Sequence, residues 1–124
     1  MKSRLSTVMT LGLAALLCLT ITASPATAET LERVEAKRVC MVNDTVFPRD
    51  QIPVDVDGKT YFGCCEMCKG RLAKDAAVRS ATDPVSGQAV DKATAVIGAS
   101  ADGKVLYFES EETFSKFGKA TGGA

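Results

Sequence analysis

The sequence predicts an α+β fold in which two tandem ββα units pack together as one small domain. Residues 58–72 align position by position with residues 103–117, and an internal repeat of this spacing indicates two copies of one supersecondary unit. In each copy, a tight-turn dipeptide precedes a short run of aromatic and β-branched residues and then a helical pattern. Once an N-terminal leader is set aside, the remaining length suits one compact unit, or two very small ones.

Residues 1–28 have the pattern of a secretory signal peptide. Lys2 and Arg4 precede an uncharged apolar run over residues 9–21, and Ala26-Thr27-Ala28 follows as an Ala-x-Ala cleavage site. The apolar run is shorter than the roughly 20 residues that span a bilayer. We therefore expect cleavage after Ala28, a periplasmic or secreted mature protein, and no integral membrane segment in it.

Cys18 lies inside this leader, where a cysteine can be the site of a lipid anchor. Leu17 stands before it, whereas lipidation signals usually have Gly or Ala at that position. We therefore expect Cys18 to leave with the leader and not to carry a lipid.

The charge balance and the missing residue types narrow the function classes. The chain carries 15 basic and 15 acidic residues, so it has no basic excess with which to bind the phosphates of a nucleic acid. Because it contains no His, a Ser-His-Asp or Cys-His catalytic arrangement is impossible, and we expect no enzyme. A metal site would have to use thiolate, thioether or oxygen ligands. This set favours soft ions such as Cu(I), or Zn(II), over hard ones.

The turns and strands of the two copies correspond. Asp57-Gly58 and Asp102-Gly103 are dipeptides typical of tight hairpin turns. The second strand of each hairpin is expected to follow at once, over residues 59–63 and 104–108.

A helix is expected after each of these strands, over about residues 65–78 and 110–118. In the second helix, Ser110 is a good N-cap, and the acidic residues after it lie where the helix dipole favours negative charge. Phe114 and Phe117 give this helix one apolar face. The expected organisation is a leader (1–28), an N-terminal arm (29–37), a first unit (38–78), a second unit (79–118) and a tail (119–124).

The cysteines of the mature chain all fall in the first unit. Cys40 comes from a knuckle before the strands, Cys64 from the end of a strand, and Cys65 and Cys68 from the first turn of a helix. Several thiols can thus converge on one point. Amides at a helix start stabilise thiolates, which makes these sulfurs better metal ligands.

The pattern resembles the YHS/TRASH family of small metal-binding modules, whose members pair an Asp-Pro-Val-Cys-Gly-Met knuckle with Gly-Lys-x-Tyr-Tyr-Phe-Cys-Ser-x-x-Cys. The first copy matches through Cys40, Gly58-Lys59, Tyr61, Cys64 and Cys68. The second copy matches through Asp83-Pro84-Val85, Gly87, Val90-Asp91, Gly103-Lys104, Tyr107-Phe108, Ser110 and Phe117. The resemblance covers most of the mature chain. It implies treble-clef-like ββα modules and a role in heavy-metal trafficking, buffering, resistance or sensing.

Two departures from the family pattern change the expected ligand set. The second copy has Ser86, Glu109 and Thr113 at the three cysteine positions, so we interpret it as a metal-free packing partner. The first copy has Cys65 where the family usually has Ser, which offers a fourth thiol for a tetrahedral site. The expected ligands are therefore Cys40, Cys64, Cys65 and Cys68, holding one Cu(I) or Zn(II) per chain.

Three alternatives stay open. The cysteines could form disulfide staples, which oxidising compartments favour in small exported domains. Cys65 and Cys68 form a Cys-x-x-Cys pair that could serve a thiol oxidoreductase, although the repeat lacks the βαβ framework of thioredoxin-like folds. Met41 and Met67 flank the cysteines and could add thioether ligands, but Met more often fills gaps in a core. The partner that would exchange metal with this protein, a metal exporter or a metalloenzyme of the cell envelope, is not identified by the sequence.

Overall fold

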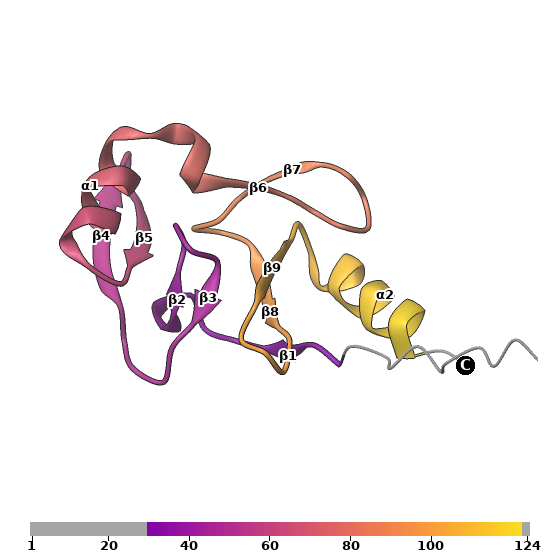
Figure 1. Cartoon of the computed structure of the whole chain (residues 1–124). Coiled ribbons are helices and arrows are strands. Elements are labelled where there is room, and N and C mark those ends of the chain that lie inside the picture. The colour runs from indigo at the N-terminus through magenta and orange to yellow at the C-terminus, as the bar shows by residue number, and fades with distance from the viewer. Residues whose placement is uncertain (1–29, 123–124) are drawn as a thin grey trace, which may run out of the picture.

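The computed structural model describes residues 30–122 and shows a small mixed α/β protein with several short antiparallel sheets and two α-helices (Figure 1). The predicted leader and Cys18 lie outside the described residues. The elements are β1 (Glu32–Arg33), the 3-10 helix η1 (Ala36–Arg38), β2 (Val39–Cys40), β3 (Thr45–Val46), β4 (Ile52–Val56), β5 (Lys59–Gly63), α1 (Glu66–Lys74), the 3-10 helix η2 (Ala76–Arg79), β6 (Ser80–Thr82), β7 (Ala89–Asp91), β8 (Val96–Ala99), β9 (Val105–Phe108) and α2 (Glu111–Gly122).

The same order of elements occurs twice along the chain. A short hairpin (β2–β3), a longer hairpin (β4–β5) and α1 are followed by a short hairpin (β6–β7), a longer hairpin (β8–β9) and α2. Figure 1 shows β4, β5 and α1 at one end of the molecule and α2 at the other, with β2 and β3 between them. The coarse prediction of a small mixed α/β fold is confirmed.

The β4–β5 hairpin closes through the turn that the sequence predicts. Val56 pairs with Lys59, so Asp57 and Gly58 form a two-residue loop. Both have positive φ, at +51° and +77°, which is the conformation that such a loop requires and that Asp and Gly tolerate best. The β8–β9 connection is longer: the Gly103 amide donates to the Ser100 carbonyl at 2.9 Å, closing a four-residue turn.

The first helix ends earlier than the sequence suggests. α1 stops at Lys74, because Asp75 has an extended backbone and its carboxylate accepts a hydrogen bond from the Ala77 amide at 2.9 Å. Residues 76–79 then form the separate 3-10 helix η2 instead of the last turn of α1. α2 begins as predicted: the Ser110 hydroxyl accepts a hydrogen bond from the Thr113 amide at 3.3 Å.

The two halves of the chain share backbone hydrogen bonds. The Val105 amide donates to the Asp44 carbonyl at 3.0 Å, and the Val46 amide donates to the Gly103 carbonyl at 3.0 Å, so β3 lies against the start of β9. In addition, β1 from the N-terminal arm pairs with β8, which makes a three-stranded sheet of order β1-β8-β9. Sequence reasoning placed no strand in this arm.

One core cluster takes side chains from both halves. Its buried members are Val39, Met41, Val54, Tyr61, Leu72, Ile97, Ala99, Val105 and Tyr107. Phe108 is also fully buried and meets Phe114 and Phe117 edge to face, with ring centroids 5.3 and 5.6 Å apart. Across residues 30–122, no helix has the length and apolar character needed to cross a membrane.

Candidate metal centre

Three thiols converge in the first half of the chain. The Sγ atoms of Cys40, Cys64 and Cys68 all lie within 4.8 Å of one another, and those of Cys64 and Cys68 are 3.6 Å apart. All three residues are free thiols, Cys40 and Cys68 are buried, and Cys64 is half-buried. Such a group of soft donors has the size and chemistry of a site for a single soft metal ion.

Each of the three thiols comes from a different element. Cys40 ends β2, Cys64 follows β5, and Cys68 lies in the first turn of α1. Residues 41–44, the part of the knuckle that follows Cys40, connect β2 to β3. The first amide of this segment, that of Met41, donates to the Phe62 carbonyl of β5 at 2.9 Å. This hydrogen bond joins the strand that carries Cys40 to the strand that leads to Cys64.

A glycine lets the helix start close to the end of β5. A Cβ atom on Gly63 would lie 3.0 Å from the Cys68 Cβ and 3.2 Å from the Lys69 amide nitrogen. Any side chain at this position would push the first turn of α1 away from the strand. Gly63 therefore permits Cys68 to approach the thiols of Cys40 and Cys64.

The protonation of the three thiols is unequal. Burial acts to raise the pKa of Cys40, but hydrogen bonds with the backbone at Asn43 and Val42 and with the Cys64 thiol outweigh it, and the pKa is lowered. Burial, followed by the neighbouring thiols, raises the pKa of Cys68 to about 12. The hydrogen bond with Cys40, followed by burial, raises the pKa of Cys64. Cys40 is thus the most readily ionised of the three thiols, and a bound cation would be needed to hold all three sulfurs ionised.

Cys65, the fourth predicted ligand, lies at the rim of this group. It is exposed, has an extended backbone and occupies the N-cap position of α1, and it does not belong to the converging triad of the described residues. Hydrogen bonds with the backbone and then the side chain of Cys68 lower the pKa of Cys65. Its thiol is therefore an exposed donor with a lowered pKa beside the converging triad.

The flanking methionines differ from each other. Met41 is fully buried and belongs to the core cluster, as expected for a methionine that fills a core. Met67 is 78% exposed on the first turn of α1.

A polar contact that sequence reasoning missed is the Asn43 side-chain amide, whose nitrogen lies 3.6 Å from the Cys64 Sγ.

In the second half, a carboxylate takes the central place among the positions equivalent to the three cysteines. One oxygen of Asp83 accepts from the amides of Val85 and Ser86 at 2.7 and 3.1 Å. The other accepts from the Glu109 amide at 2.8 Å and from the Thr113 hydroxyl at 2.6 Å.

Asp83 is fully buried, and its burial acts to raise its pKa. The hydrogen bonds, with Thr113 first, outweigh burial, so the pKa is lowered and the carboxylate stays ionised. The Glu109 side chain is exposed. Sequence reasoning missed the role of Asp83. The one signal that the sequence offers is an acidic residue directly before Pro84, close to Ser86.

No family model, no curated protein and no solved structure matches this chain. Its function must therefore be inferred from the converging thiols and from the residues that surround them.

Proposed function

We propose that this protein binds one soft metal ion, Cu(I) or Zn(II), per chain through Cys40, Cys64 and Cys68. The observation that supports this most directly is the convergence of three Sγ atoms from three separate elements within 4.8 Å. A set of thiol donors without any histidine in the chain selects soft ions over hard ones. Cys65, exposed at the rim, supplies the fourth thiol when the ion prefers four ligands, as Zn(II) does.

The proposal extends to the wider biology of the chain. The two halves are treble-clef-like ββα modules of the YHS/TRASH type, and the second has exchanged its metal for the Asp83 carboxylate. Residues 1–28 direct export, so the mature protein works in the cell envelope as a metal carrier, buffer or sensor and not as an enzyme. Its partners are the metal ion and a metal exporter or a metalloenzyme of that compartment.

The test is a metal titration of the mature protein, purified anaerobically and fully reduced. We expect about one Cu(I) per chain, measured in competition with a chelator of known affinity. Cys40→Ser, Cys64→Ser and Cys68→Ser should each abolish high-affinity binding, because each removes one of three convergent donors. Ser86→Ala is the matched control, because it alters the knuckle position of the second half that corresponds to Cys40.

Cys65→Ser separates a three-thiol site from a four-thiol site. We expect it to retain Cu(I) and to weaken Zn(II), since only the tetrahedral ion needs the fourth sulfur. Retention of full affinity in the Cys40 and Cys68 variants would contradict the proposal. A thiol count that finds two disulfides in protein isolated from the cell envelope without added oxidant would instead favour the disulfide-stapled alternative, for which the 3.6 Å Sγ separation of Cys64 and Cys68 offers one pairing.

A further inference from the structure

A buried lysine from the second half holds the knuckle of the metal centre. Lys92 follows β7 and is only 4% exposed, yet its ammonium donates to the Met41 carbonyl at 2.7 Å and to an Asp44 carboxylate oxygen at 2.8 Å. Met41 and Asp44 are the first and last residues of the knuckle that follows Cys40. Because a buried ammonium is costly unless it is paired, these two contacts fix Lys92 and the knuckle relative to each other.

Tyr107 of β9 completes this attachment. Its hydroxyl donates to the same Asp44 oxygen at 2.8 Å, and the Lys92 nitrogen lies 4.9 Å from the centre of its ring. Burial and then the Asp44 carboxylate raise the pKa of Tyr107, so its hydroxyl remains a donor. Asp44 has a positive φ of +51°, an uncommon conformation that this network holds in place.

The knuckle controls the environment of the Cys40 thiol. The Cys40 thiol forms hydrogen bonds with the backbone at Asn43 and Val42, both inside the knuckle. A knuckle that changed shape would move these groups away from the sulfur. The Lys92 and Tyr107 contacts at its two ends therefore act on the position of Cys40 without touching it.

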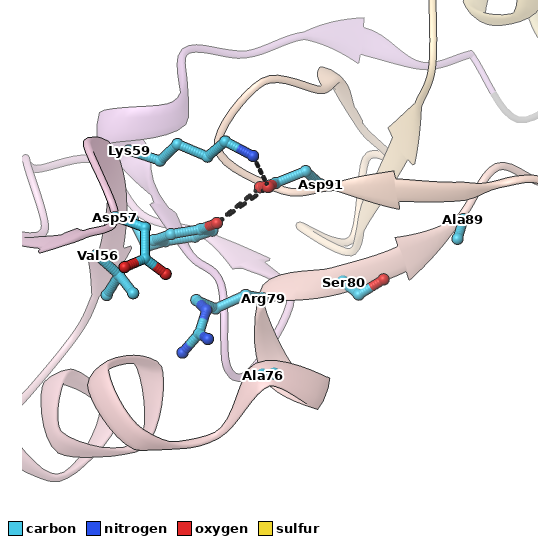
Figure 2. A pocket seen from close by; sticks show the side chains of 9 residues that line it. Val56, Asp57, Lys59, Ala76, Arg79, Ser80, Ala89 and Asp91 are labelled. Atoms are coloured by element: carbon cyan, nitrogen blue, oxygen red, sulfur yellow. Dashed lines mark hydrogen bonds and ion pairs between the residues drawn. The ribbon is translucent and has the colours of Figure 1, made fainter.

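The residue before Lys92, Asp91, holds the strand β5 that leads to Cys64. Asp91 accepts hydrogen bonds from the Lys59 ammonium at 2.7 Å and from the Tyr61 hydroxyl at 2.9 Å. Figure 2 shows Lys59 reaching from the start of β5 to Asp91 on the neighbouring hairpin. Because β5 leads directly to Cys64, two consecutive residues of the second half contact the knuckle that follows Cys40 and the strand that precedes Cys64.

From these contacts we infer that Lys92 is a positioning residue of the metal centre, and that the Asp91-Lys92 pair sets the separation of the Cys40 and Cys64 thiols. This inference rests on the proposed metal binding. Residues that orient the ligands of a metal typically change metal affinity by about 10–100-fold when they are removed.

The experiment compares Cu(I) affinity, by chelator competition, in the wild type, Lys92→Met and Lys74→Met. Lys92→Met keeps most of the length of the side chain but removes its charge and donors, and we expect it to bind about 10–100-fold more weakly. Lys74→Met is the matched control at the exposed end of α1 and should bind as the wild type does. Lys92→Arg restores a positive donor and should recover part of the lost affinity.

A spectroscopic readout separates positioning from general destabilisation. In the Co(II)-substituted protein, thiolate-to-cobalt charge-transfer absorbance reports how many sulfurs bind the ion. We expect Lys92→Met to lose part of this absorbance relative to the wild type, because Cys40 is displaced, at a temperature where circular dichroism shows the variant folded. Unchanged affinity and an unchanged cobalt spectrum in folded Lys92→Met would overturn the inference.

Two gentler variants decide the matter if Lys92→Met does not fold. Tyr107→Phe removes one hydroxyl, and Asp44→Asn removes a charge while keeping a side chain that tolerates the positive φ. Both should weaken Cu(I) binding, and wild-type affinity in both would overturn the inference. The wild-type titration is read first: if the wild type binds no metal, the proposed function fails, whereas metal binding that is indifferent to these variants refutes only the role of Lys92.

Discussion

Cys68 gives the centre a defined dependence on pH. Its pKa is raised to about 12, so at neutral pH its thiol holds a proton that a metal ion must displace. Protons and metal compete for the sulfur, and raising the pH removes the competitor. Metal affinity should therefore increase as pH rises across the neutral range, by up to about tenfold per pH unit for each proton displaced.

Calorimetry in buffers of different ionisation enthalpy counts these protons. We expect at least two protons released per Cu(I), one each from Cys68 and Cys64, because both have a raised pKa, whereas the pKa of Cys40 is lowered. An affinity that is independent of pH, with no proton release, would show that the thiols are already ionised without metal.

Thr113 offers a second test at the level of a single atom. Its buried hydroxyl donates to Asp83 at 2.6 Å, and removing one partner of a buried charged group should cost about 1–3 kcal/mol of unfolding free energy. We expect this loss in Thr113→Val, measured by urea denaturation, with unchanged metal stoichiometry. Thr113→Ser keeps the hydroxyl and should lose much less. A loss of bound metal in folded Thr113→Val would show that the second half contributes a ligand.

The close packing of α1 against β5 depends on Gly63, and a substitution at this position tests it. Gly63→Ala would place a Cβ 3.0 Å from that of Cys68, and such overpacking typically costs about 1–3 kcal/mol. We expect lower stability and weaker metal binding, since the helix start must move.

Gly70 is the matched control for Gly63. A Cβ at Gly70 would meet nothing within 4 Å, and Gly70→Ala should stabilise α1 by about 0.5–1 kcal/mol without changing metal affinity. Thermal melts and Cu(I) titrations of the two variants decide this, and equal effects of both would contradict the close-approach argument.

The elements that the sequence predicts well are those with strong local signals. The predicted strand over residues 59–63 coincides with β5, because a turn dipeptide fixes where it begins. The predicted first helix is too long, since alanines at positions 76 and 77 suit a helix. In the structure, the Asp75 carboxylate caps a separate 3-10 turn at these positions. β1 has only two residues, Glu32 and Arg33, and becomes a strand through its pairing with β8.

Some residues of the candidate site could be predicted from the sequence, and others could not. Spacing and residue type alone were enough to propose that Cys40, Cys64 and Cys68 meet. The roles of Asp83 and Lys92 were missed, because the contacts that define them are made with residues far away in the sequence. A buried lysine or aspartate looks like a surface residue until the fold supplies its partners.

At the scale of the whole molecule, the shared core predicts cooperative unfolding. Phe108 is fully buried against Phe114 and Phe117, and its replacement by Ala should cost about 3–5 kcal/mol. Because the core cluster takes residues from both halves, we expect one thermal transition at a lower temperature, and metal should raise it.

The control for Phe108→Ala is Val85→Ala, since Val85 is 39% exposed and should change the melting temperature little. Thermal melts followed by far-ultraviolet circular dichroism and by tyrosine fluorescence would check this. Two separate transitions, only one of them sensitive to metal, would show that the halves unfold independently.

The Asp83 carboxylate has a consequence for how fast metal is captured. Small metal-dependent domains commonly fold only when the ion arrives, so their loading includes a folding step. Here the second half contains the buried Asp83 carboxylate in place of a metal ion. Its residues Lys92 and Tyr107 also hold the knuckle beside Cys40 by hydrogen bonds. The thiols would then be preassembled in the metal-free protein, and stopped-flow loading should follow a single bimolecular phase whose rate grows linearly with metal concentration.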